Sequence, residues 1–169
     1  MLDTKFALPI MEKLLKNKIL IGYNPLKDEV DYESTILGTG LQGVKPKKHF
    51  TVSNKKCHDP FLMAALFSEK FDKKDVTVFI PGKKFDAHGT RHGHGNGWYD
   101  RFLSKIPTHW HRVGVAHASQ FYNSKLARQT WDQPVDWVIV CGGSSCILHK
   151  TFARHSDVTE DTKDGFLLL

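Results

Sequence analysis

Four short and nearly continuous runs of apolar residues limit the folds open to this chain more than any other feature. They cover residues 19–23, 76–80, 113–116 and 137–140. A turn signal follows each of the first two runs, Asn24-Pro25 and then Pro81-Gly82. A run of this length that does not alternate with polar residues indicates a strand buried on both faces, which is typical of a parallel sheet.

Segments with helical patterns separate these expected strands. Residues 6–15 carry apolar side chains at helical spacing, and a second helix is predicted with Asp59 as its N-cap and Pro60 at its first position. Two further helices are expected at about 98–104 and 119–129, and an irregular connection over 38–58. Alternating strands and helices predict an α/β fold, a three-layer sandwich with a mostly parallel central sheet flanked by helices.

Length and composition predict a single α/β domain over residues 1–169. With 40% hydrophobic and 25% charged residues, the chain has the composition of a globular protein and not of a disordered or membrane-spanning one. No apolar run is as long as a membrane span, and the N-terminus lacks the layout of a cleavable signal. We therefore expect a cytoplasmic protein without membrane contact.

The cysteines Cys57, Cys141 and Cys146 favour neither a disulfide framework nor a zinc site, because their number is odd and their spacings fit neither. This cysteine usage is consistent with a reducing compartment. We expect residues 141–146 to form a turn between strands and assign them no chemistry.

The net charge of +6 favours an anionic partner without distinguishing a nucleotide from a nucleic acid or an acidic metabolite. Basic pairs such as Lys47-Lys48 and Lys83-Lys84 are scattered and are not interleaved with aromatic residues. They predict a solvated surface, so nucleic acid is not the expected partner.

The segment of residues 79–103 contains the residues best suited to chemistry, in the order strand, glycine-rich loop, helix. Gly93, Gly95 and Gly97 remove side chains at every second position, which allows backbone N–H groups to converge on an anion. Arg91 adds a permanent positive charge, and the carboxylate of Asp100 is placed to hold magnesium against bound phosphates. Three glycines serve a tight turn equally well, and the loop matches neither the Walker A nor the dinucleotide-binding pattern, so both interpretations stay open.

The order of residues across this segment resembles the signature of the 5-formyltetrahydrofolate cyclo-ligase family, also called methenyltetrahydrofolate synthetases. That signature runs Pro-Gly, then Phe-Asp, then Gly-x-Arg-Leu-Gly-Arg-Gly-x-Gly-Tyr-Tyr-Asp. The positions that match it in register are Pro81, Gly82, Phe85, Asp86, Gly89, Arg91, Gly93, Gly95, Gly97, Tyr99 and Asp100. A weaker likeness extends to residues 19–31 and to Asp132 with Val135-Asp136.

The resemblance implies a ligase of folate one-carbon metabolism that uses ATP and Mg²⁺ to convert 5-formyltetrahydrofolate to 5,10-methenyltetrahydrofolate, releasing ADP and phosphate. Its implied partners are the folate and ATP, and we expect a monomer. The implied ATP-binding residues are Arg91, His92, Gly93, His94, Gly95, Asn96, Gly97, Trp98 and Tyr99. The implied folate-binding residues are Asn24, Glu29, His94, Gly95, Asn96, Gly97 and Trp98. Arg91 and His94 are the implied catalytic residues, and Asp100 and Asp132 the implied magnesium ligands.

Several positions depart from the family pattern. His92 stands for its leucine, His94 for its second arginine and Trp98 for its first tyrosine. We also expect the domain to lack the basic N-terminal helix usual in the family. The alternative prediction is therefore a catalytically inactive member that binds a nucleotide, a folate or RNA. Because Trp98 and Tyr99 are adjacent, we expect one to pack in the core and the other to meet the ligand.

His88, His92 and His94 lie close in sequence and suggest transition-metal binding as a further alternative. No cysteine or carboxylate completes a familiar ligand spacing around them. Replacement of arginine by histidine in a phosphate loop accounts for His92 and His94 without a metal, so we favour the phosphate loop.

Overall fold

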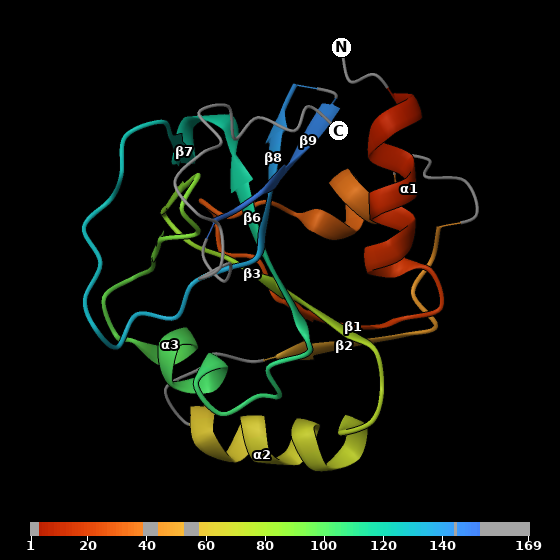
Figure 1. The fold of residues 1–169 in the computed structure, drawn as a ribbon, viewed down its shortest axis with the longest axis vertical. Helices are drawn as coiled ribbons and strands as arrows, with labels where there is room; N and C mark the ends of the chain where they lie inside the picture. The colour runs from red at the N-terminus through yellow and green to blue at the C-terminus, as the bar shows by residue number, and fades with distance from the viewer. Residues whose placement is uncertain (1–3, 39–43, 53–57, 144, 153–169) are drawn as a thin grey trace.

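The computed structural model describes residues 4–38, 44–52, 58–143 and 145–152, and a six-stranded sheet lies at its centre (Figure 1). The strands, in their order across the sheet, are β2 (Lys48–Val52), β1 (Ile19–Tyr23), β3 (Val76–Ile80), β6 (His111–His117), β8 (Trp137–Gly142) and β9 (Ser145–Lys150). The first five are parallel, and β9 runs antiparallel to β8. The predicted mostly parallel sheet is confirmed, and each of the four apolar runs forms a strand.

Helices cover both faces of this sheet (Figure 1). They are α1 (Thr4–Leu15), α2 (Pro60–Phe71) and α3 (Trp98–Leu103). On β3, Val78 packs into the core shared with α2 and α3, whereas the next residue, Phe79, packs into the core shared with α1. The hydroxyl of Thr77 donates to the carbonyl of Leu14 at the end of α1, at 2.5 Å. Successive side chains of β3 thus pack against helices on opposite faces of the sheet, which confirms the three-layer α/β sandwich.

Local signals account for the start of α2. Asp59 is its N-cap, and the carboxylate accepts hydrogen bonds from the N–H groups of Phe61 and Leu62 at 2.8 and 3.3 Å. Pro60 occupies the first turn, where it has no N–H to leave unpaired. None of the helices in the described ranges is long and apolar enough to cross a membrane.

A small second sheet follows β3 and positions the glycine-rich loop. Its strands, in order, are β5 (Arg91–His92), β4 (Lys84–Asp86) and β7 (Phe121–Tyr122). The ring of Phe85 is fully buried, and a Cβ atom added to Gly114 of β6 would overlap it. The small sheet therefore packs directly on the central one, which fixes where the loop after β5 begins.

The helix predicted at about 119–129 is wrong. The chain forms the short 3-10 helix η2 (Ala118–Gln120), then β7, and it has no helix from residue 123 to 130. The N–H of Leu126 donates to the buried carboxylate of Asp86 at 2.7 Å, which holds this segment extended. Most side chains of residues 123–130 are exposed, so a helix here would have had no apolar face to bury.

The irregular connection predicted over 38–58 is wrong in part, since it contains β2. This edge strand pairs in parallel with β1, with Ile19 opposite Lys48 and Tyr23 opposite Val52. Only Val52 of its five side chains is buried, so the apolar pattern of a central strand is absent. The π-helix η1 (Glu33–Leu37) precedes it, and residues 39–43 and 53–57 lie outside the described part of the chain.

The turn expected between strands at residues 141–146 is confirmed, but the expectation that the cysteines form no disulfide is wrong. Cys141 and Cys146 are directly opposite each other on β8 and β9, with Cα atoms 4.1 Å apart, and they form a disulfide. A two-strand hairpin register brings together cysteines five residues apart, which a reading of spacing alone does not reveal. Cys57 lies outside the described residues.

Candidate functional site

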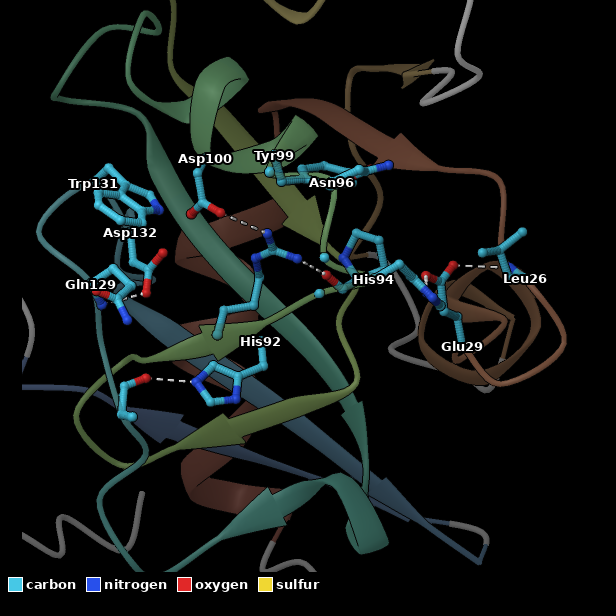
Figure 2. A pocket seen from close by; sticks show the side chains of 16 residues that line it. Leu26, Glu29, His92, His94, Asn96, Tyr99, Asp100, Gln129, Trp131 and Asp132 are labelled. Carbon is cyan, nitrogen blue, oxygen red and sulfur yellow. Dashed lines mark hydrogen bonds and ion pairs between the residues drawn. The ribbon is translucent and has the colours of Figure 1, made fainter.

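A pocket of about 650 Å³ lies where the glycine-rich loop, the turn after β1 and the loop before β8 meet (Figure 2). The loop from Arg91 to Gly97 forms much of its wall. The turn after β1 contributes Leu26 and Glu29, and the segment before β8 contributes residues from Ala127 to Asp132. Three segments that are distant in sequence thus share one cavity at the carboxyl ends of β1 and β3, the edge at which parallel sheets bind ligands.

Arg91 provides a fixed cation in the pocket wall. Its side chain is 4% exposed, and Nη1 donates to the carbonyl of Pro81 at 3.1 Å. Nη2 lies 3.5 Å from Oδ2 of Asp100, and the guanidinium lies over the ring of Tyr99. Burial lowers the pKa of Arg91 and the Asp100 carboxylate opposes that shift, but a guanidinium keeps its charge at neutral pH. Its Nε has no hydrogen-bond partner within the described residues, so the group retains donor capacity.

Asp100 and Asp132, the two predicted magnesium ligands, line the same pocket. Each carboxylate accepts a hydrogen bond from a backbone N–H of the segment 129–133. Oδ1 of Asp100 accepts a hydrogen bond from the N–H of Gln133 at 2.9 Å. Oδ2 of Asp132, the residue before Gln133, accepts one from the N–H of Gln129 at 2.7 Å. Both carboxylates therefore have defined orientations, although 32 residues separate them in the chain.

This donor set fits magnesium. Mg²⁺ is commonly held by one or two carboxylates and completes its shell with water and substrate phosphates. Over the described ranges, no group of three or more His, Cys, Asp and Glu side chains is arranged to enclose a metal ion. The carboxylates of Asp100 and Asp132 suit an ion that arrives with a phosphorylated ligand, and Arg91 beside them suits the phosphates.

Glu29 and His94 form the other end of the pocket. The Glu29 side chain is 2% exposed, and its Oε2 accepts a hydrogen bond from the N–H of Leu26 at 2.9 Å. Oε1 lies 3.2 Å from Nε2 of His94 in the glycine-rich loop. Figure 2 shows this pair on one side of the view and Asp100 with Asp132 on the other. The pocket thus has an acidic, metal-compatible end and a second end with a buried carboxylate and an imidazole.

The predicted loop residues differ in how they meet the pocket. His92, Gly93, Gly95, Asn96 and Gly97 line it. A Cβ atom at Gly93 would lie 2.6 Å from Nη1 of Arg91, so a glycine is needed there for the guanidinium to occupy its place. Gly97 has a φ of 63° and precedes the first residue of α3, a backbone conformation that favours glycine.

Trp98 and Tyr99 both pack in the core, with ring centroids 5.1 Å apart, and of the two only Tyr99 also lines the pocket. Trp98 stacks on Phe102 in the core and donates its indole N–H to the carbonyl of His58 at 2.9 Å. Tyr99 lines the pocket, and its hydroxyl is buried with no partner in the described part of the chain. Burial raises the pKa of Tyr99, which keeps the phenol neutral. Binding of a ligand by Trp98 stays a prediction without geometric support.

Two further predictions find no support in this arrangement. Asn24 is exposed in the turn after β1, outside the lining of the pocket. The three histidines of the metal alternative have different neighbours: His88 lies near Phe152, while His92 meets the carbonyl of Ala127 and His94 meets Glu29.

The sequence patterns missed the pocket residues between 127 and 131. Gln129 is the last residue of the helix expected at about 119–129, and the highly exposed Trp131 follows that segment. The one signal that pointed to them is that Trp131 directly precedes Asp132, a residue singled out by the family likeness.

Comparisons with known proteins identify the family of the chain. The sequence model of the 5-formyltetrahydrofolate cyclo-ligase family matches residues 42–141, more than half of the chain. A 5-formyltetrahydrofolate cyclo-ligase of Mycoplasma genitalium is 29% identical over 148 residues, 84% of this chain and 85% of that protein.

A solved structure supports the same fold. The 5,10-methenyltetrahydrofolate synthetase of Aquifex aeolicus, determined by NMR, aligns with a TM-score of 0.51 at 21% identity and covers 95% of this chain and 87% of its own. The extent of the family match, which includes the whole glycine-rich loop and both aspartates of the pocket, shows that the chain belongs to the 5-formyltetrahydrofolate cyclo-ligase family.

Proposed function

We propose that this protein converts 5-formyltetrahydrofolate to 5,10-methenyltetrahydrofolate with consumption of ATP. The observation that carries the proposal is the buried Arg91 guanidinium, which lies beside the Asp100 carboxylate in a pocket that Asp132 also lines. A fixed cation next to two oriented carboxylates suits a nucleotide whose phosphates are bound together with Mg²⁺. Glu29 and His94, at the other end of the pocket, would bind the folate.

The reaction explains why these groups are needed together. Transfer of the γ-phosphoryl group to the formyl oxygen releases ADP and turns a poor leaving group into phosphate. The neighbouring folate nitrogen then attacks the same carbon, phosphate leaves with the former formyl oxygen, and the attacking nitrogen loses its proton. Both steps depend on holding the formyl oxygen in line with the phosphoryl group, so the protein acts chiefly by positioning and by charge stabilisation.

The chain's own residues would divide this work. Arg91 would donate to phosphate oxygens through its guanidinium, whose orientation is set by the carbonyl of Pro81 and by Asp100. Asp100 and Asp132 would hold Mg²⁺, which supplies charge neutralisation at the phosphates when it is bound. The open space beside the exposed Gly95, where nothing lies within 4 Å of an added Cβ atom, leaves room for the nucleotide and the formyl group to approach each other.

The test is the ATP- and Mg²⁺-dependent appearance of methenyltetrahydrofolate absorbance. Arg91→Ala and Asp100→Asn should each reduce kcat/KM at least about tenfold, because each removes a charged contact to the phosphates or their ion. Asp100→Asn keeps an oxygen acceptor for the Gln133 N–H, so its fold should survive. Asp72→Asn, at the exposed end of α2, is the matched control and should retain full activity.

The second candidate is an inactive family member that binds a nucleotide or folate, and the observation that favours it is His94 in the place of the family's second arginine. A histidine lacks the permanent positive charge of an arginine, so one fixed charge is lost from the loop. Folded protein that binds ATP and 5-formyltetrahydrofolate but gives no absorbance change would support this candidate and reject the enzyme. A monomeric state and a cytoplasmic location stay predictions.

A further inference from the structure

Trp131 exposes an indole ring at the mouth of the pocket. Its side chain lines the cavity although the residue is 66% exposed, whereas Trp98 and Trp110 are buried in the core. Leu26 is the other strongly exposed large apolar residue that lines this pocket, and it lies at the end formed by Glu29. An indole left in water at the edge of a cavity offers a flat apolar face on which a ligand can stack.

The backbone on both sides of Trp131 is held by the two carboxylates of the site. The N–H of Gln129 donates to the Asp132 carboxylate, and the N–H of Asp132 donates back to the carbonyl of Gln129. On the other side, the N–H of Gln133 donates to Asp100. The indole therefore projects from a turn whose position is tied to the residues that would hold the metal ion.

The position of Trp131 along the pocket indicates which part of which ligand it meets. Figure 2 shows Trp131 beside Asp132 and Asp100 on one side of the view, with Glu29 and Leu26 on the other side. Phosphates bound beside Arg91, Asp100 and Asp132 would leave the folate at the Glu29 end. The nucleoside attached to those phosphates would then extend toward Trp131.

We propose that the indole of Trp131 stacks on the purine base of the nucleotide, so that this residue supplies affinity for the base while Arg91 and the carboxylates supply affinity for the phosphates. This inference rests on the proposed function, because it requires a nucleotide in the pocket. Stacking fits the exposed face of the indole, since every base presents a π-surface and aromatic side chains bind it without hydrogen bonds.

The test separates the base from the phosphates. Binding of ATP and of tripolyphosphate, each with Mg²⁺, is measured by calorimetry on the folded wild type and on Trp131→Ala, Trp131→Phe and Thr130→Ala. Trp131→Ala should weaken ATP binding about tenfold, the scale of one base stacked on one aromatic ring, and leave tripolyphosphate binding unchanged. Trp131→Phe should retain most of the ATP affinity, and Thr130→Ala, which alters the exposed neighbouring residue, should retain all of it.

Other outcomes overturn the inference in distinguishable ways. An equal loss of ATP and tripolyphosphate affinity in Trp131→Ala would mean that the residue only supports the loop that positions Asp132. A loss of 5-formyltetrahydrofolate affinity with unchanged ATP affinity would place the folate at this end of the pocket. Failure of the wild type itself to bind ATP would reject the proposed function, whereas wild-type binding with no effect of Trp131→Ala would reject only the stacking.

Discussion

The imidazole Nε2 of His94 lies 3.2 Å from Oε1 of Glu29, although 65 residues separate the two in the chain. Glu29 follows β1 and His94 follows β5, and the carboxylate is held on its other oxygen by the N–H of Leu26. A buried carboxylate with one backbone donor and one imidazole is oriented before any ligand arrives. Through this contact Glu29, which lies in the turn after β1, forms part of the pocket wall together with His94.

Replacement of Glu29 by glutamine should weaken binding of 5-formyltetrahydrofolate. The substitution keeps the size of the side chain but removes its charge, and hydrogen bonds to charged groups contribute about 1.5–3 kcal/mol. We expect the dissociation constant for the folate, measured by calorimetry, to rise about tenfold or more while that for ATP changes little. Glu33→Gln on η1 is the matched control, and equal folate binding by wild type and Glu29→Gln would show that the carboxylate only braces the loop.

Gly93→Ala should impair nucleotide binding. The added methyl group would lie 2.6 Å from Nη1 of Arg91, so the guanidinium has to leave its contacts with Pro81 and Asp100. ATP affinity should fall about tenfold, consistent with the loss of one charged hydrogen bond.

Gly143→Ala, in the turn between β8 and β9, provides the contrasting control. Nothing lies within 4 Å of its added methyl group, and its φ of 60° makes alanine unfavourable by about 1–2 kcal/mol. This variant should therefore lose stability in urea denaturation but keep its ATP affinity. Normal ATP binding by Gly93→Ala would contradict the assignment of the Arg91 cation to the phosphates.

The stability of the fold should fall as the pH drops from neutral toward and below 6.5, partly because of His149. Burial lowers the pKa of His149 below its ordinary value of 6.5, and its ring stacks on Phe121. The unfolded chain therefore binds more protons than the folded one over the range between the two pKa values, so stability rises with pH there and is lost on acidification.

Urea denaturation of wild type and His149→Gln at a series of pH values between 5 and 8 checks this contribution. The variant should show a weaker pH dependence of its unfolding free energy than the wild type, whatever its stability at neutral pH. His109→Gln, at an exposed position, should keep the wild-type dependence. Identical slopes in wild type and His149→Gln would assign the acid sensitivity to other groups, such as the partly buried His111, whose pKa burial also lowers.

The disulfide between Cys141 and Cys146 should be measurable directly. Alkylation of the denatured, non-reduced protein should label one of the three cysteines, and reduction should make all three reactive. Closure of so short a loop contributes about 2 kcal/mol in the chain-entropy description, so Cys146→Ser should lower the unfolding free energy by about that amount. Cys57→Ser is the control, and three reactive cysteines without reduction would contradict the disulfide.

Local sequence patterns were sufficient to predict the elements that follow from local physics. The apolar runs at 19–23 and 76–80 became strands with those bounds, and Asp59 with Pro60 begins α2 as expected. The glycine-rich loop and Asp100 were also recognisable, because all of these residues lie within one short stretch. The helix cap and the glycine-rich loop depend on residues near one another in the chain. The two strands depend on continuous runs of apolar side chains that the sheet buries.

Other features depend on contacts between distant segments, and no local pattern carries them. The segment after β7 is extended because Leu126 is hydrogen-bonded to Asp86, 40 residues away, and β2 forms because β1 offers it a free edge. Cys141 and Cys146 can form a disulfide because the register of the β8–β9 hairpin places them opposite each other. Within the pocket, only folding brings Glu29 to His94 and sets Trp131 beside Asp100, since hydrogen bonds across the cavity, and not the spacing of residues, determine where these side chains lie.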